Sequence, residues 1–178
     1  MMIALPVLLS ELLTRVGSER AVTLSLDFAE RPVALRAESL TPDMREACAQ
    51  YVAAAREALR LGRANDRLVR AHEDFFEAGW RTPDHSDVTH VLNSAVRLAC
   101  QDMLIEVGAL NRAGRTNPSP KYIAKTAQSE VGRWYAERAD DSADRREVDR
   151  RARWEEARWQ IQHVIATEPY PGGGRGRS

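Results

Sequence analysis

The spacing of apolar residues changes along the first part of the chain, and each change indicates a different element. Residues 6–16 carry leucine and valine at three- and four-residue intervals, which predicts a short helix that ends at Gly17. Residues 21–28 then alternate apolar and polar positions, as a half-buried strand does. Residues 29–32 are typical of a turn, and the alternation resumes at residues 33–37. The pattern therefore predicts a small β-hairpin after the first helix.

From residue 41 onward the apolar spacing is helical. Residues 41–43 (Thr-Pro-Asp) supply an N-cap, a proline at the first helical position and an early acidic residue. The helical spacing then continues to Ala78, although Gly62 inside it costs about 1 kcal/mol relative to alanine. Two alternatives stay open: one helix of about 35 residues, or two helices separated by a break at residues 62–65.

The remaining sequence predicts further helices. The Thr-Pro-Asp cap returns at residues 82–84 and begins a second long helix through about Leu110; an internal duplication and convergence both account for this repeat. Residues 111–120, rich in Asn, Gly and Pro, predict a loop, and Ser119 and Pro120 at its end cap a third long helix. Residues 136–153 are nearly all charged or alanine, so they form a solvated helix or a poorly ordered connector. A final helix follows and ends at Pro169.

Together these elements predict a mostly α-helical fold with a small N-terminal β-hairpin. We expect an N-terminal helix and hairpin over residues 1–40, a bundle of four to five helices over residues 41–168 and a flexible tail over residues 169–178. The 178-residue chain is 43% hydrophobic and has no apolar run long enough to cross a membrane. Cys48 and Cys100 lie in helical patterns and predict reduced, buried thiols in a cytoplasmic protein.

The charge composition narrows the class of partner. Lys+Arg and Asp+Glu both number 26, so the net charge is zero. This balance argues against a free-standing, tight DNA binder, whose domains are usually strongly basic. Only Lys121 and Lys125 are lysines, so 24 of the 26 cations are arginine. Nearly every positive charge can therefore make a planar, bidentate contact with phosphate or carboxylate.

Five arginines recur at intervals of four, three, four and three residues. They are termed the arginine stripe: Arg56, Arg60, Arg63, Arg67 and Arg70. On one continuous helix they would share an arc of about 80° over about 21 Å, opposite an apolar face. A rod of guanidinium groups suits a phosphate backbone. Glu57 and Asp66 can pair with some of them, so an acidic protein surface or a plain solvated face remain alternatives.

A second group of cations lies in and after the loop. These loop cations are Arg112, Arg115, Lys121 and Lys125, with no acidic residue before Gln128. Neutral donors such as Asn111 and Asn117 accompany them, and Tyr122 can stack on an unpaired base. We expect the loop cations to act together with the arginine stripe only if the two segments adjoin in space.

In size and character, residues 41–166 resemble the small helical subunit of multi-protein CRISPR effector complexes. The resemblance rests on a short, helical chain without a catalytic motif. It implies a non-enzymatic subunit without cofactors that contacts the backbone of RNA or single-stranded DNA. Other protein subunits, and several copies of the same chain, would be its neighbours in the ribonucleoprotein. The predicted hairpin departs from the all-helical pattern of that family.

Two rival functions remain. The first is a phage-encoded or regulatory adaptor that docks an acidic protein surface through the arginine stripe. The second is a metal-dependent enzyme built on His72, Asp84, His85 and His90. The spacing of these residues lacks the intervals that metal ligands on helices require, so we expect no metal site. His72 lies on the apolar face of its helix and is expected to be a hydrogen-bonded core residue.

Overall fold

The computed structural model describes residues 5–81 and 86–167, and these form seven α-helices and one short 3-10 helix, with no strand among them. The helices are α1 (Leu5–Arg15), α2 (Ser18–Leu35), α3 (Pro42–Leu61), α4 (Asp66–Arg81), α5 (Ser86–Glu106), α6 (Pro120–Glu137) and α7 (Arg145–Ala166), with the 3-10 helix η1 (Arg112–Gly114) before α6. The prediction of a mostly helical bundle is confirmed, although the number of helices exceeds the expected four to five.

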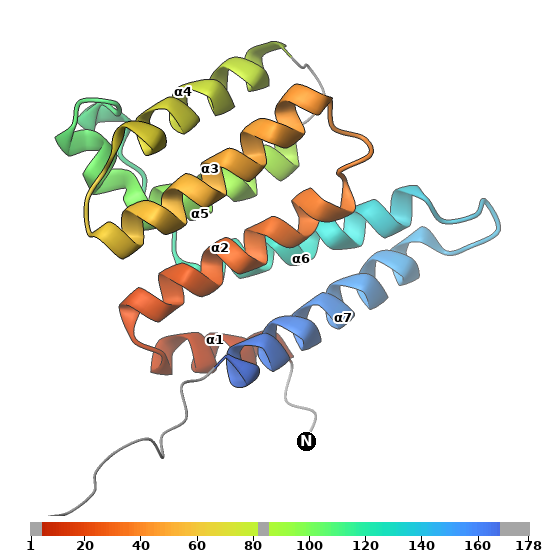
Figure 1. The fold of residues 1–178 in the computed structure, drawn as a ribbon. Coiled ribbons are helices and arrows are strands. Elements are labelled where there is room, and N and C mark those ends of the chain that lie inside the picture. Colours follow the sequence, from red (N-terminus) through yellow and green to blue (C-terminus); the bar gives the residue numbers. More distant parts are fainter. Residues whose placement is uncertain (1–4, 82–85, 168–178) are drawn as a thin grey trace, which may run out of the picture.

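Helix α2 lies in the middle of the bundle. It packs against α3, α5 and α6, so it joins two groups of helices. Figure 1 shows α3, α4 and α5 on one side of α2, and α1, α6 and α7 on the other. Within these groups α3 and α4 form one helical hairpin, and α6 and α7 form another.

The predicted β-hairpin is wrong, because residues 18–35 form α2. The buried side chains recur at helical intervals and include small ones: Ala21, Leu24, Ser25, Leu26, Phe28, Ala29 and Pro32. Ser25 is a polar position of the predicted strand, yet its hydroxyl is buried and donates to the carbonyl oxygen of Ala21 at 2.7 Å. Pro32, expected in a turn, lies within the last turns of α2, and the helix continues past it to Leu35. Small residues on the buried face had concealed the helical period.

The long helical segment after residue 41 forms two helices, α3 and α4, with a break at residues 62–65. Gly62 adopts φ +67°, a left-handed conformation that ends α3 at little cost only for glycine. The amide of Arg63 then donates to the carbonyl oxygen of Ala58 at 3.2 Å, which closes the helix end. The Asn65 side chain accepts a hydrogen bond from the amide of Leu68 at 2.9 Å and begins α4.

Two predicted N-caps are confirmed. The Thr41 hydroxyl accepts a hydrogen bond from the amide of Met44 at 3.3 Å, and Ser119 accepts one from Tyr122 at 3.1 Å. The second Thr-Pro-Asp cap, at residues 82–84, lies outside the described residues.

The C-terminal half departs from the expected bounds in two places. Helix α5 ends at Glu106, short of Leu110, because Gly108 adopts φ +77°. The segment 136–153 contains the end of α6, a connection and the start of α7, so most of it is helical. The expected tail over residues 169–178 lies outside the described residues.

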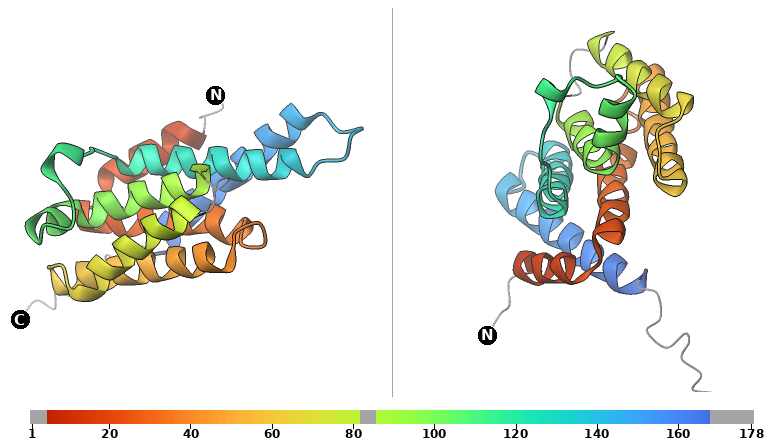
Figure 2. Two further views of the ribbon diagram at one scale, coloured as in Figure 1. Left: turned by 90° about the horizontal axis from the view of Figure 1, so that it is seen from above. Right: turned by 90° about the vertical axis from the view of Figure 1, so that its left-hand side faces the viewer.

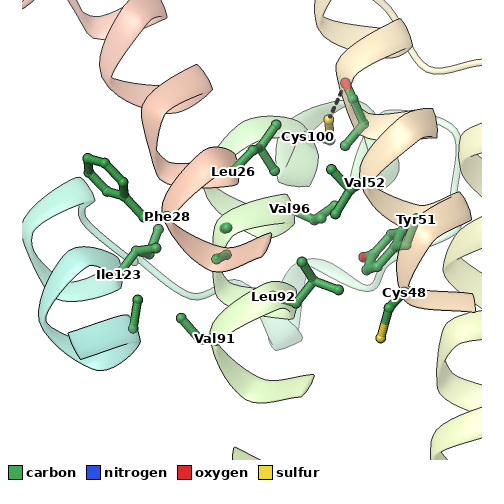
Figure 3. Close-up of a cluster of buried hydrophobic side chains, with 14 of the residues drawn as sticks. Leu26, Phe28, Cys48, Tyr51, Val52, Val91, Leu92, Val96, Cys100 and Ile123 are labelled. Atoms are coloured by element: carbon green, nitrogen blue, oxygen red, sulfur yellow. Dashed lines mark hydrogen bonds between the residues drawn. The ribbon is translucent and has the colours of Figure 1, made fainter. Parts of the chain in front are cut away.

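One hydrophobic core includes side chains from all seven helices. Figure 3 shows its centre, where Leu26 and Phe28 of α2 lie among residues of α3, α5 and α6. Cys48 and Cys100 are buried free thiols, as predicted, and burial raises the pKa of each to about 12. The Cys100 thiol lies 3.7 Å from the carbonyl oxygen of Ala55, which places α5 directly against α3.

A buried polar network holds α7 against α6 and α2. The Gln160 side chain accepts from Gln128 at 2.8 Å and donates to the carbonyl oxygen of Ala124 at 3.2 Å. One turn earlier, Glu156 is buried and accepts from Arg31 Nε at 2.9 Å. Burial raises the pKa of Glu156, and the charge of Arg31 opposes this only in part. The network therefore fixes the register of α7 through hydrogen bonds that apolar packing alone would not require.

Candidate nucleic-acid interface

The arginine stripe does not lie along one rod. Because the chain turns at Gly62, Arg56 and Arg60 belong to α3, Arg63 lies in the connection, and the last two arginines belong to α4. Helices α3 and α4 pack against each other as a hairpin (Figure 1). The expectation of an uninterrupted row of about 21 Å is therefore wrong.

Arg56 is held by the protein's own carboxylates. Its Nη2 donates to Asp27 Oδ1 at 2.8 Å and also pairs with Glu30, so two acids of α2 grip one guanidinium of α3. Burial by itself lowers the pKa of Arg56, but the hydrogen bonds and charges of these acids outweigh it and raise the pKa. Asp27 Oδ2 lies 2.8 Å from His163 Nε2, which adds α7 to the cluster. Arg56 is thus a structural residue.

The two arginines of α4 are also engaged within the hairpin. Arg67 Nη1 donates to Glu57 Oε2 at 2.8 Å, and its other terminal nitrogen donates to Gln50 at 3.3 Å. Arg70 Nε donates to the backbone oxygen of Asp66 at 3.3 Å, one turn earlier in the same helix. The contacts of Arg67 neutralise its charge and tie α4 to α3, whereas Arg70 keeps its charge exposed.

Arg60 and Arg63 differ from the rest of the stripe. Both are exposed, and neither has a carboxylate of the described chain within ion-pair distance. Arg60 lies in the last turn of α3, where a cation interacts favourably with the helix dipole. These two guanidinium groups are available to an external anion.

The loop at residues 111–119 is fixed to α5 by polar contacts. The side chain of Gln101 donates to the carbonyl oxygen of Thr116 and accepts from its amide, each at 2.8 Å. Arg97 donates to the carbonyl oxygen of Gly114 at 2.6 Å. These contacts give the loop a defined position on the surface of α5.

The four loop cations separate into two places. Arg115 pairs with Asp102 of α5 at 3.1 Å, whereas Arg112 is exposed and has no such partner among the described residues. Lys121 and Lys125 lie in the first two turns of α6 and line a separate groove against α1 and α7. The four cations are neighbours in the sequence, but in the fold the two arginines and the two lysines lie on different surfaces.

The α3–α4 connection and η1 lie at the same end of the bundle. Figure 1 and the view from above in Figure 2 both place residues 62–65 near the connection between α5 and α6. The unpaired cations there are termed the cationic end: Arg60, Arg63 and Arg112. Exposed Asp66 and Glu106 lie in the same region, so the net positive charge of this surface is small.

Tyr122 has a protein partner. Its hydroxyl lies 2.9 Å from His90 Nε2, and the two rings meet edge to face with an interplanar angle of 88°. Tyr122 as a whole remains 45% exposed, so an external group can still reach it. His90 thus joins α5 to α6 and positions the aromatic ring.

The residues of the metal-enzyme hypothesis do not form a cluster in the described structure. His72 is buried, and its Nδ1 lies 2.7 Å from the hydroxyl oxygen of Tyr51, as expected for a hydrogen-bonded core histidine. Burial lowers the pKa of His72, with a further contribution from Arg97. Asp84 and His85 lie outside the described residues. Elsewhere in the described chain, no group of His, Cys, Asp and Glu could hold a metal ion.

Sequence reasoning missed the cluster around Asp27. A signal existed, because Asp27 and Glu30 stand three residues apart and share a face if the segment is helical. Assigning residues 21–28 to a strand hid that spacing. The contribution of His163, more than 130 residues away, left no local signal.

No described helix combines the length and the apolar character that crossing a membrane requires. Comparisons of the chain with family models, with curated proteins and with solved structures found no match.

Proposed function

We propose that the protein is a non-enzymatic helical subunit that contacts the backbone of RNA or single-stranded DNA within a ribonucleoprotein assembly. The observation that carries the proposal is the cationic end, where two segments about fifty residues apart in sequence lie at the same end of the bundle and each carries exposed, unpaired arginines. Arginine side chains of this kind bind phosphate oxygens without reading the bases. The cationic end is smaller than the continuous row of five arginines that the sequence predicted, and its three arginines can contact two or three phosphates.

The weak net charge of this surface agrees with a subunit that binds beside other subunits. A protein with zero net charge and a few unpaired arginines binds nucleic acid weakly alone, and neighbouring chains would supply further contacts. The resemblance to small CRISPR effector subunits remains a prediction. Replacing the predicted hairpin by α2 removes the one departure from an all-helical pattern.

The test removes the three charges without reversing them. A variant with Arg60→Gln, Arg63→Gln and Arg112→Gln should bind single-stranded RNA or DNA at least about tenfold more weakly than the parent chain. The parent should lose affinity with salt at a log–log slope of about −2, as three neutralised phosphates of a single strand require. The variant should show a nearly flat salt dependence.

The matched control removes three exposed arginines elsewhere, Arg15, Arg45 and Arg146, which have no ion pair in the described structure. It changes the net charge equally and should retain the affinity and the salt slope of the parent. Equal losses in both variants would mean that binding follows total charge alone, and no binding by the parent at low salt would reject the proposal.

The adaptor hypothesis is favoured by a different observation. The Trp80 side chain, near the end of α4, is 87% exposed. Exposed tryptophans are over-represented among the residues that dominate protein–protein binding. If the protein is an adaptor, Trp80→Ala should abolish capture of its protein partner, whereas the three-arginine variant should affect capture only when the partner surface is acidic.

A further inference from the structure

A groove of about 490 Å³ lies between α1, α6 and α7, and none of the arginines of the cationic end lines it. Its floor is apolar and is formed by Leu9 and Leu13 of α1 with Ala124 and Ala157 of the other two helices. Trp154, which is 49% exposed, forms part of its wall. This volume and this largely apolar lining fall within the range of small-molecule sites.

Cations surround the apolar floor. Lys121 and Lys125 come from α6, and Arg150 and Arg153 come from α7. One carboxylate, Asp149, also lines the groove, so the lining carries an excess of positive charge.

The arginines and the lysines differ in their partners. Arg153 Nε lies 2.8 Å from Asp149 Oδ2, and Arg150 pairs with Glu147, so both arginines are balanced within α7. Neither Lys121 nor Lys125 has an ion pair with any described residue. The two lysines are therefore the unneutralised charges of the groove.

The position of the lysines makes the local potential more positive. They stand four residues apart in the first turns of α6, and no acidic residue occupies the first turn. Backbone amides at the beginning of a helix carry partial positive charge, so cations there are unfavourable unless an anion offsets them. An apolar cavity with two such lysines at its edge is complementary to a molecule with an anionic head and an apolar body.

We propose that this groove binds a small anionic amphiphile, with its carboxylate or phosphate head between Lys121 and Lys125 and its alkyl body on the leucine and alanine floor. Trp154 packs along the alkyl body. The inference is independent of the cationic end, because none of the three arginines defined there lines the groove.

The experiment uses four single-chain ligands of equal length, each below its micelle-forming concentration: decanoate, decyl phosphate, decanol and decyltrimethylammonium. Calorimetric titration of the full chain should give one saturable site for one or both anions. Decanol should bind at least about tenfold more weakly, and the cation should not bind. The two anions distinguish a carboxylate ligand from a phosphate ligand.

Two variants locate the site. Lys121→Gln with Lys125→Gln should weaken anion binding at least about tenfold and leave decanol unchanged, because it removes the head-group contacts alone. The control pair, Arg45→Gln with Arg70→Gln, removes the same charge from α3 and α4, which do not line the groove, and should bind like the parent. In a Trp154→Phe variant the fluorescence response to the anion should be lost, since the other three tryptophans do not line the groove.

Three outcomes would overturn the proposal. Anions that bind no more tightly than decanol would remove the role of the lysines. Unchanged anion affinity in the double lysine variant would place the ligand elsewhere. Displacement of a bound anion by a short single-stranded oligonucleotide, with loss of oligonucleotide binding in the lysine variant, would instead assign the groove to nucleic acid.

Discussion

Arg56 donates a hydrogen bond to Asp27 across 2.8 Å, and this contact joins α3 to α2. The same carboxylate meets His163 of α7, so one acidic side chain connects three helices. The first arginine of the stripe is therefore already paired within the protein, although its spacing matches that of its neighbours.

Arg56→Gln should lower the free energy of unfolding by about 1–2 kcal/mol, a value reduced from that of a buried pair because the side chain is 37% exposed. Urea denaturation followed by circular dichroism measures this loss. Arg60→Gln, on the same helix and without an ion pair among the described residues, should stay within about 0.5 kcal/mol of the parent. Equal effects of the two substitutions would contradict a structural role specific to Arg56.

Gly62→Ala should destabilise the fold by about 1–2 kcal/mol, because φ +67° is strained for a residue with a Cβ atom. The space around Gly62 is open, so the cost is conformational and not steric. Gly114→Ala is the matched control, since its φ is not positive and an added Cβ makes only an ordinary contact with Leu110. Thermal melts of both variants measure the difference. A neutral Gly62→Ala would mean that the turn can be rebuilt without a left-handed residue.

His72 should make folding less favourable in mild acid. Its pKa is lowered in the folded chain, so the unfolded chain binds the proton more readily below its ordinary value of about 6.5. The stability contribution of the neutral ring is complete above that pH and is lost as the pH falls toward the lowered pKa. His72→Gln should remove this part of the pH dependence in urea unfolding between pH 7 and pH 5. An identical profile in the variant would show that other groups account for it.

Glu156 should make folding less favourable as the pH rises above about 4.5, which is the opposite of the effect of His72. Its pKa is raised by burial, so the folded chain binds the proton more readily than the unfolded chain, and this stabilising contribution is lost as the pH rises above about 4.5. Glu156→Gln cannot ionise, so its stability relative to the parent should improve from pH 4.5 to pH 7. Paired unfolding curves at the two values measure the change. A constant difference would contradict the inferred shift.

Cys48 and Cys100 should react very slowly with thiol reagents in the native state. Their pKa values near 12 and their burial keep the reactive thiolate scarce and inaccessible at pH 8. Labelling followed by mass spectrometry should accelerate strongly in urea and reach two adducts per chain. Fast labelling of the native protein would mean that α3 and α5 separate readily.

The sequence predicted the helices whose ends carry strong local signals. The caps at Thr41 and Ser119 and the loop after α5 lie where the residues indicated, since a cap forms from groups only a few positions apart. Helix α2 was missed because Ala21, Ser25 and Ala29 are buried without being strongly apolar. The larger apolar side chains alternate with polar ones, so this part of the sequence indicated a strand and not the helix that it forms.

The sequence identified the individual cations of the candidate site but not how they are arranged or paired. Spacing identified the cations, but it could not show which acids neutralise them. Arg115 meets Asp102 thirteen positions earlier, within a loop that folds back on α5. Arg56 meets acids of a helix that the pattern had assigned to strands. Ion pairing depends on tertiary contacts, and local periodicity contains no information about these.

Helix α1 packs on α7, so the first and last helices of the described residues are neighbours. During synthesis at about 5–20 residues per second, the apolar side of α1 waits several seconds until its partner leaves the ribosome. Until then Leu9 and Leu13 lack the surface that later covers them. The apolar side of α1 therefore stays exposed on the nascent chain until α7 has been synthesised and can pack against it.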